Sequence, residues 1–178
     1  TKSGWIEVIC GCMFSGKTEE LIRRINRAKL ANQTVKVFKP EFETRYHADN
    51  VVSHNAQYLE ATPVATARQV LLLADNADVI GIDEAQFFDH EIVEVCNHMA
   101  NAGRRVIVVG LDMDYTGKPF GAMPYLLAVA EFVTKLHAIC EKSGDLASYS
   151  FRKLASKEEI VLGEKESYEP RSRKYFYE

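Results

Sequence analysis

Hydrophobic and polar positions alternate in two patterns along the first 112 residues. Short runs rich in β-branched residues predict strands at 5–10, 34–38, 79–83 and 105–110. The stretches between them repeat apolar residues at steps of three and four, which predicts helices at 16–31, 67–76 and about 90–102. Strand–helix alternation of this kind is typical of a mostly parallel sheet with helices on both faces, so we predict an α/β fold.

The pattern changes after Cys140. Up to that residue it predicts a helix at 123–131 and a strand at 132–140. Residues 141–178 are polar and rich in Ser, Lys, Glu and Tyr, with strand-like fragments at 148–154 and 160–162 and a hydrophilic stretch at 153–165 that is typical of a solvated hairpin. We therefore expect an α/β domain at 1–139 and a small β appendage at 140–178 that ends in an extended loop.

Composition and charge narrow the class of protein. Of the 178 residues, 47% are hydrophobic and 26% charged, and the formal net charge is −3. A general nucleic-acid binder would show a basic excess, so we expect no nucleic-acid partner. No apolar run approaches the ~20 residues that span a bilayer, and the N-terminal residues lack the apolar stretch of a signal peptide. The four cysteines form no C-x-x-C pair and are expected to be reduced thiols: Cys10, Cys12, Cys96 and Cys140. The sequence thus predicts a soluble cytoplasmic protein with no membrane partner.

A glycine-rich segment between the first predicted strand and helix matches G-x-x-x-x-G-K-[ST] in full. It consists of Gly11, Cys12, Met13, Phe14, Ser15, Gly16, Lys17 and Thr18. In such a phosphate-binding loop (P-loop) the backbone N–H groups surround the phosphates, the lysine neutralises β/γ oxygens and the Ser/Thr hydroxyl binds Mg²⁺. The alternative is a chance match in a glycine-containing turn. The strand before the segment and the amphipathic helix after it favour a P-loop that binds a nucleotide.

An acidic pair, Asp83 and Glu84, follows the third predicted strand. Beside a P-loop, the first carboxylate holds Mg²⁺ and the second can reach the nucleophile. A solvated turn or a helix N-cap is the alternative for the pair considered alone. Glu84 would polarise water in an ATPase, or accept the proton of a substrate hydroxyl in a kinase. The aromatic pair Phe87 and Phe88 suits a flat organic substrate, although such pairs after a strand more often lie in the core.

Six short motifs occur in a fixed order along the chain. They are Gly-x-Met-Phe-Ser-Gly-Lys-Thr at 11–18, Phe-Lys-Pro at 38–40 followed by Thr-Arg-Tyr at 44–46, Ile-Asp-Glu-Ala-Gln-Phe-Phe at 82–88, Gly-Leu-Asp at 110–112, Lys-Pro-Phe-Gly at 118–121, and Val-Thr-Lys-Leu-x-Ala-Ile-Cys at 133–140. From about residue 4 to residue 168 the chain resembles the thymidine kinases of bacteria and animal cytosol. The resemblance implies a P-loop NTPase-like fold, ATP and Mg²⁺ as cofactors, and thymidine or deoxyuridine as acceptor. It also implies feedback binding of dTTP and a homotetramer.

The same resemblance implies roles for individual residues. Lys17 and the rest of the P-loop, with Gln86, would bind ATP, while Thr18 and Asp83 would hold Mg²⁺. Glu84 would act as the base that takes the proton of the 5′-OH, and Arg45 would assist phosphoryl transfer. A further set would contact the thymine: Met13, Phe87, Leu111, Tyr115, Ser150, Val161, Gly163 and Tyr168. The last three belong to the segment 160–168, which resembles a substrate-covering lasso loop.

The chain departs from the family pattern where relatives carry four structural zinc ligands. The matching positions are Cys140, Ser143, Ser172 and Tyr175, and Cys140 alone is a usual zinc ligand. We therefore expect no zinc, and a lasso that orders mainly when nucleoside binds. These altered residues also support an alternative function, a P-loop ATPase or nucleotide-binding regulator without nucleoside kinase activity.

Overall fold

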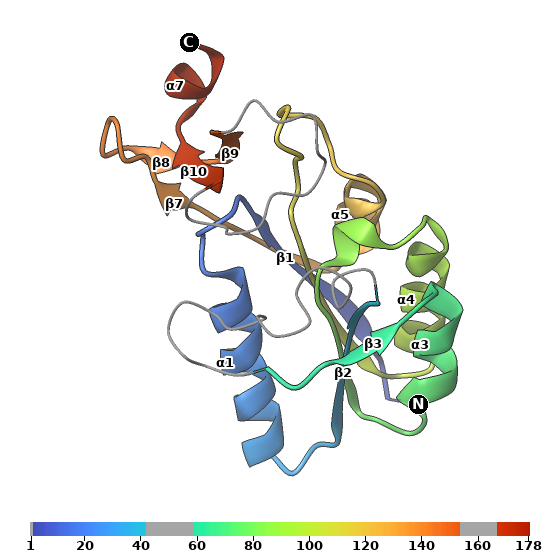
Figure 1. Cartoon of the computed structure of the whole chain (residues 1–178). Helices are drawn as coiled ribbons and strands as arrows, with labels where there is room; N and C mark the ends of the chain where they lie inside the picture. Colours follow the sequence, from blue (N-terminus) through green and yellow to red (C-terminus); the bar gives the residue numbers. More distant parts are fainter. Residues whose placement is uncertain (1, 42–58, 154–166) are drawn as a thin grey trace.

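A six-stranded sheet forms the centre of the computed structural model, which describes residues 2–41, 59–153 and 167–178 (Figure 1). Its strands are β1 (Trp5–Gly11), β2 (Val35–Pro40), β3 (Thr62–Val64), β4 (Val79–Ile82), β5 (Arg105–Gly110) and β6 (Phe132–Leu136). They lie in the order β3-β2-β4-β5-β1-β6, and every pair of neighbours is parallel. The predicted parallel α/β sheet is confirmed. The edge strand β3 was not predicted, because three residues that include Pro63 carry too little alternation to be recognised.

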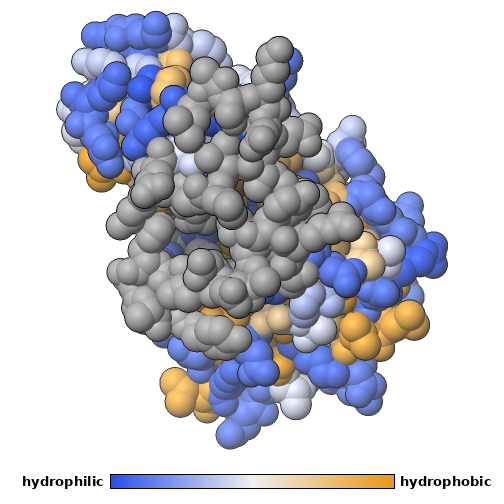
Figure 2. Space-filling view, viewed as in Figure 1, coloured by the Kyte–Doolittle hydropathy of each residue, from blue (hydrophilic) through white to orange (hydrophobic). Residues whose placement is uncertain are grey.

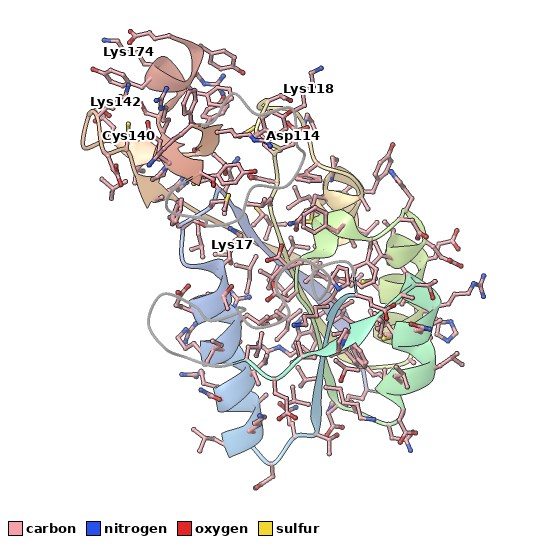
Figure 3. The ribbon with its side chains drawn as sticks, viewed as in Figure 1. Lys17, Asp114, Lys118, Cys140, Lys142 and Lys174 are labelled. Atoms are coloured by element: carbon pink, nitrogen blue, oxygen red, sulfur yellow. The ribbon has the colours of Figure 1, made fainter. Side chains whose placement is uncertain are left out.

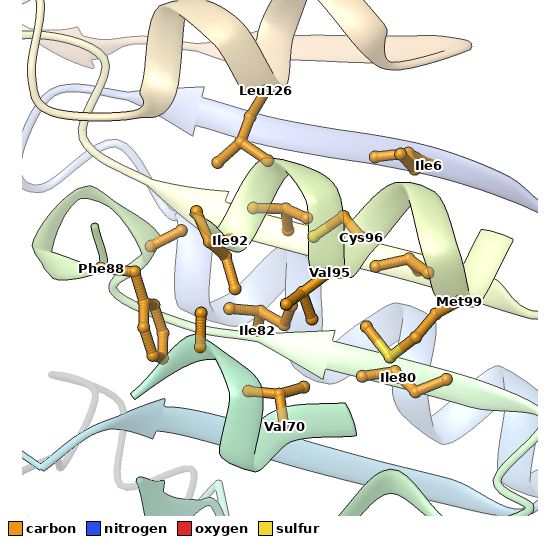
Figure 4. Packing of buried hydrophobic residues seen from close by; sticks show 14 of the residues in the cluster. Ile6, Val70, Ile80, Ile82, Phe88, Ile92, Val95, Cys96, Met99 and Leu126 are labelled. Carbon is orange, nitrogen blue, oxygen red and sulfur yellow. The ribbon is translucent and has the colours of Figure 1, made fainter. Parts of the chain in front are cut away.

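Helices cover both faces of the sheet (Figure 1). They are α1 (Lys17–Leu30), α3 (Ala67–Ala74), the short 3₁₀ helix η1 (Ala85–Phe87), α4 (Glu91–Asn101) and α5 (Met123–Val129). Side chains of α1 such as Leu21 and Ile25 pack with Ile9 and Ile107 on one face. On the other face α4 packs between the sheet and its helical neighbours (Figure 4). The central strands β1, β4 and β5 are therefore buried on both sides, which holds their carboxyl ends in fixed relative positions.

The appendage consists of two antiparallel strand pairs and a short helix. Strands β7 (Ala138–Ile139) and β8 (Leu146–Ala147) form one pair, β9 (Tyr149–Arg152) and β10 (Tyr168–Arg171) form the other, and α7 (Arg173–Tyr177) follows. The fragment predicted at 148–154 is confirmed as β9. The fragment predicted at 160–162 and most of the hairpin predicted at 153–165 lie outside the described residues.

Two predictions about this region were wrong. The strand expected at 132–140 is two strands in two sheets, because β6 pairs with β1 only as far as Gly11 opposite Leu136, where the P-loop turns away. The extended loop expected at the end of the chain is replaced by β10 and α7. The ring of Phe176 stacks on Tyr149 with centroids 4.5 Å apart, and this contact packs α7 against β9. The sequence did not predict the helix because polar residues surround Phe176 in the chain.

Where Figure 2 colours the surface by hydropathy, it is mostly hydrophilic, and the hydrophobic residues form small separate groups. Among the described residues, no helix is long and apolar enough to cross a membrane. All four cysteines are buried free thiols.

Candidate active site

The P-loop lies at the carboxyl end of β1 and leads directly into α1 (Figure 3). Gly11 has a φ of 146°, and a Cβ there would lie 2.4 Å from the carbonyl oxygen of Leu136, so no other residue fits. Gly16 precedes α1 with a φ of 88°. The Nζ of Lys17 donates to the carbonyl oxygen of Cys12 at 2.7 Å and thus lies over the loop. A cation and the positive end of α1 therefore converge on one small region, which suits a phosphate group.

The acidic pair begins where β4 ends, two strands away from β1. Asp83 is only 4% exposed. Burial and the neighbouring charge of Glu84 raise the pKa of Asp83 to about 7, although the charges of Lys17 and Lys39 act in the opposite direction. Because the charge of Lys17 affects the pKa of Asp83, the carboxylate lies close enough to the P-loop to interact with it electrostatically. Glu84 has a φ of 53°, a left-handed conformation that costs a non-glycine residue roughly 1–3 kcal/mol.

Two aromatic side chains expected to contact the thymine are partly exposed beside these groups. Phe87 is 40% exposed, and its ring meets Phe120 edge-on with centroids 5.5 Å apart. Tyr115 is 47% exposed, and the guanidinium carbon of Arg152 lies 5.0 Å from its ring centroid. The Tyr115 loop is shaped by Asp114, whose carboxylate accepts hydrogen bonds from the residues that follow. Both rings are therefore held by packing from one side and remain accessible from another.

The appendage reaches the P-loop through Ser150. The backbone N–H of Met13 donates to the Ser150 hydroxyl at 3.0 Å, and the thiol of Cys12 donates to the carbonyl oxygen of Ala147. In the next strand Tyr168 pairs in register with Arg152, the residue that stacks on Tyr115. The structure thus joins the P-loop to three expected thymine contacts that lie far apart in the sequence. Arg45, Val161 and Gly163 lie outside the described residues.

Comparison with known proteins decides the family. A family model described as thymidine kinase matches residues 4–176. The chain belongs to the thymidine kinase family. It is 58% identical over 173 residues to the thymidine kinase of a Rhodothermus species, covering 97% of this chain and 81% of that protein. The thymidine kinase of Bacteroides thetaiotaomicron is 53% identical over 175 residues, 98% of this chain and 88% of that protein. The crystal structure of a DNA replication initiation factor has a TM-score of 0.48 and 14% identity, with 74% of this chain and 40% of that chain covered.

Two residues within motifs shared with thymidine kinases received no role from the sequence. Asp112 is buried, and its carboxylate forms an ion pair with Lys135 at 2.9 Å. Both residues lie next to the P-loop. Arg152 was also missed, and two of its buried nitrogens find no hydrogen-bond partner within the part of the chain that the structure describes. Asp112 and Lys135 could have been noticed from their places inside shared motifs, but they are paired across distant parts of the sequence.

The positions that match the zinc ligands of other thymidine kinases come together around Cys140. Burial raises the pKa of the Cys140 thiol, but hydrogen bonds from the hydroxyls and backbone N–H groups of Ser143 and Ser172 outweigh burial and lower the pKa to about 6. Tyr175 packs against the same cluster. Within 2–41, 59–153 and 167–178, no three His, Cys, Asp or Glu residues are grouped closely enough to hold a metal ion. The absence of zinc therefore stays a prediction, tested below.

Proposed function

We propose that this protein transfers the γ-phosphate of ATP to the 5′-OH of thymidine or deoxyuridine. The observation that carries the proposal is the convergence of the P-loop, the Asp83–Glu84 pair and two accessible aromatic rings at one edge of the sheet. Membership of the thymidine kinase family supports the same acceptor. Phosphoryl transfer needs positioning and charge neutralisation more than covalent chemistry, and these groups supply both.

The residues present fit Mg²⁺. A buried carboxylate whose pKa is raised by burial and by a neighbouring charge gains stability from a divalent cation. Asp83 and the hydroxyl of Thr18 would hold the ion, which neutralises charge on the terminal phosphates when bound. Lys17 neutralises the same oxygens from the other side. Glu84 takes the proton of the 5′-OH as the oxygen attacks phosphorus, and Arg45 stabilises the transferring group.

The nucleobase pocket distinguishes this function from that of a P-loop ATPase or regulator. Such a protein would hydrolyse ATP at a rate independent of thymidine. The exposed faces of Phe87 and Tyr115 favour the kinase, because a regulator needs no aromatic walls beside its phosphate site.

The test is ADP release in the presence of thymidine, deoxyuridine, deoxycytidine, thymidylate or no acceptor. We expect release with the first two alone. The Lys17→Met variant serves as the control for contaminating kinases. Equal ADP release with and without thymidine would establish the ATPase instead.

Family membership also supports a homotetramer and feedback binding of dTTP, and the buried free thiols are consistent with the cytoplasm. Light scattering measures the oligomeric state, and inhibition by dTTP that competes with thymidine tests the feedback.

A further inference from the structure

The side chain of Gln86 is buried directly beside Glu84. It is 3% exposed and belongs to η1, the short helix that follows the acidic pair. Its Oε1 accepts from the backbone N–H of Leu111 at 3.1 Å, and its Nε2 donates to Oε2 of Glu84 at 2.7 Å. Because the Leu111 N–H can only donate, the amide oxygen must face Leu111 and the amide NH₂ must face Glu84. The orientation of the Gln86 amide is therefore set by the backbone of Leu111, the residue that directly follows β5.

Two glycines leave the space that Gln86 occupies. A Cβ on Gly110 would lie 2.8 Å from Oε1 of Gln86, and a Cβ on Gly121 would lie 2.5 Å from the backbone carbonyl oxygen of Gln86. Gly121 also has a φ of 51°. A side chain at Gly110 would therefore crowd the Gln86 amide and the sulfur of Met123, and a side chain at Gly121 would crowd the Gln86 backbone.

The fixed Gln86 amide restricts the position of the Glu84 carboxylate. Glu84 adopts a left-handed backbone conformation, and it neighbours Asp83, whose negative charge repels it. The hydrogen bond from Gln86 fixes one oxygen of this carboxylate in space. Leu111, the other partner of Gln86, is one of the residues expected to contact the thymine. The same amide thus links Glu84 to the wall of the nucleoside pocket.

The geometry points to Gln86 as a positioning residue for the reaction. The Gln86 amide holds the Glu84 carboxylate where it meets the 5′-OH, and it ties this base to the backbone of Leu111, a residue expected to contact the thymine. This role differs from the ATP contact that the family resemblance implies for Gln86. It rests on the proposed function, since it assumes that Glu84 is the base.

The experiment compares Gln86→Met, which keeps the volume but loses both hydrogen bonds, with Gln86→Asn, which stays polar but is too short to reach both partners. We expect kcat to fall about 10- to 100-fold in each variant, because small misplacements of a catalytic group have effects of this size. The KM values for ATP and thymidine should change less than about threefold, because positioning acts on the chemical step and not on uniform binding. Unchanged kcat, or a loss confined to KM, in the variants that fold would overturn the role.

A double-mutant comparison separates positioning from general damage. In a Glu84→Gln background, Gln86→Met should lower kcat no further, because the group it positions is already gone. An equal loss in both backgrounds would mean a merely structural role. Ile92→Val is the matched control, since it alters the core at α4 without touching Glu84 and should leave kcat intact. A wild-type protein inactive toward thymidine would refute the proposed function itself, which is a distinct result.

Discussion

Lys135 and Asp112 form an ion pair across the strand that leads into the P-loop. The Nζ of Lys135 lies 2.9 Å from Oδ2 of Asp112. Lys135 belongs to β6 and Asp112 follows β5, while β1 lies between them in the sheet. The pairing with Asp112 raises the pKa of Lys135. Asp112 is buried, and among the residues that the structure describes Lys135 is the cation paired with its carboxylate, so Lys135 compensates its charge.

Removing Lys135 should therefore destabilise the protein. We expect Lys135→Met to lower the free energy of unfolding by about 1–3 kcal/mol, because a buried carboxylate loses its partner. Adding Asp112→Asn should restore part of that loss, measured by urea denaturation. The exposed pair of Arg68 and Glu91 is the control, where Arg68→Met should change stability by less than about 1 kcal/mol. Equal effects at both pairs would contradict the importance of burial.

The base assignment predicts the behaviour of a nearly isosteric variant. Glu84→Gln removes the proton acceptor but keeps the shape, so kcat should fall by about 10²–10⁴. Binding of ATP, measured by calorimetry, should stay close to wild type because the P-loop is untouched. A variant with wild-type kcat would exclude Glu84 as the base.

Tyr115 should contribute its ring and not its hydroxyl. Tyr115→Phe keeps the aromatic surface beside Arg152, and we expect its KM for thymidine to be close to wild type. Tyr115→Ala removes the ring and should raise that KM about 10- to 100-fold, which corresponds to the apolar area lost. Similar KM values for both variants, from steady-state kinetics, would place the nucleoside elsewhere.

Acid stability should depend on Glu7. Burial raises the pKa of Glu7, but hydrogen bonds from Arg105, Trp5 and Arg24 lower it by more than burial raises it. The pKa of Glu7 in the folded protein is therefore below its ordinary value of 4.5. A depressed folded-state pKa means that Glu7 stabilises the fold above about pH 4.5 and that this contribution disappears as the pH falls through the folded-state value. We expect Glu7→Gln to be less stable than wild type at pH 7 and to lose less stability on acidification. Parallel stability curves from pH 7 to pH 3 would disprove the linkage.

Purified protein should contain well under one zinc per chain, and a zinc-selective chelator, added with excess Mg²⁺, should leave kinase activity intact. The reason is that serine and tyrosine are poor substitutes for thiolate at three of the four matching positions. Metal analysis by mass spectrometry gives the stoichiometry, and one zinc per chain would refute the prediction.

Hydrogen exchange separates the two halves of the segment that was expected to order on nucleoside binding. The backbone of β10 pairs with β9, so the amides of Tyr168 to Arg171 that face β9 should be protected with and without thymidine. The sequence led us to expect slower exchange on nucleoside binding across residues 160–174. The part at 160–166 lies outside the described residues and stays a prediction, whereas the pairing of β10 with β9 changes the expectation for Tyr168 to Arg171. Exchange at β10 that slows sharply on adding thymidine would show that the strand pair forms only with ligand.

The sequence by itself determined the parts that depend on local pattern. Periodicity placed the strands and helices of the sheet, and the spacing of Gly11, Gly16 and Lys17 identified the P-loop, because a phosphate-binding turn is encoded by neighbouring residues. The acidic pair after β4 was recognisable for the same reason. The resemblance carried by six ordered motifs named the family, and the family model confirmed it.

Only the tertiary structure decided which distant groups meet. The hydrogen bond that joins Gln86 to Leu111 spans 25 positions in the sequence, and that between Met13 and Ser150 spans 137. No local periodicity encodes such partners, because they follow from the order of strands in the sheet and from the packing of the appendage on the P-loop. The split between β6 and β7 has the same origin, since the segment predicted as one strand at 132–140 changes sheets where its hydrogen-bonding neighbour β1 ends at Gly11.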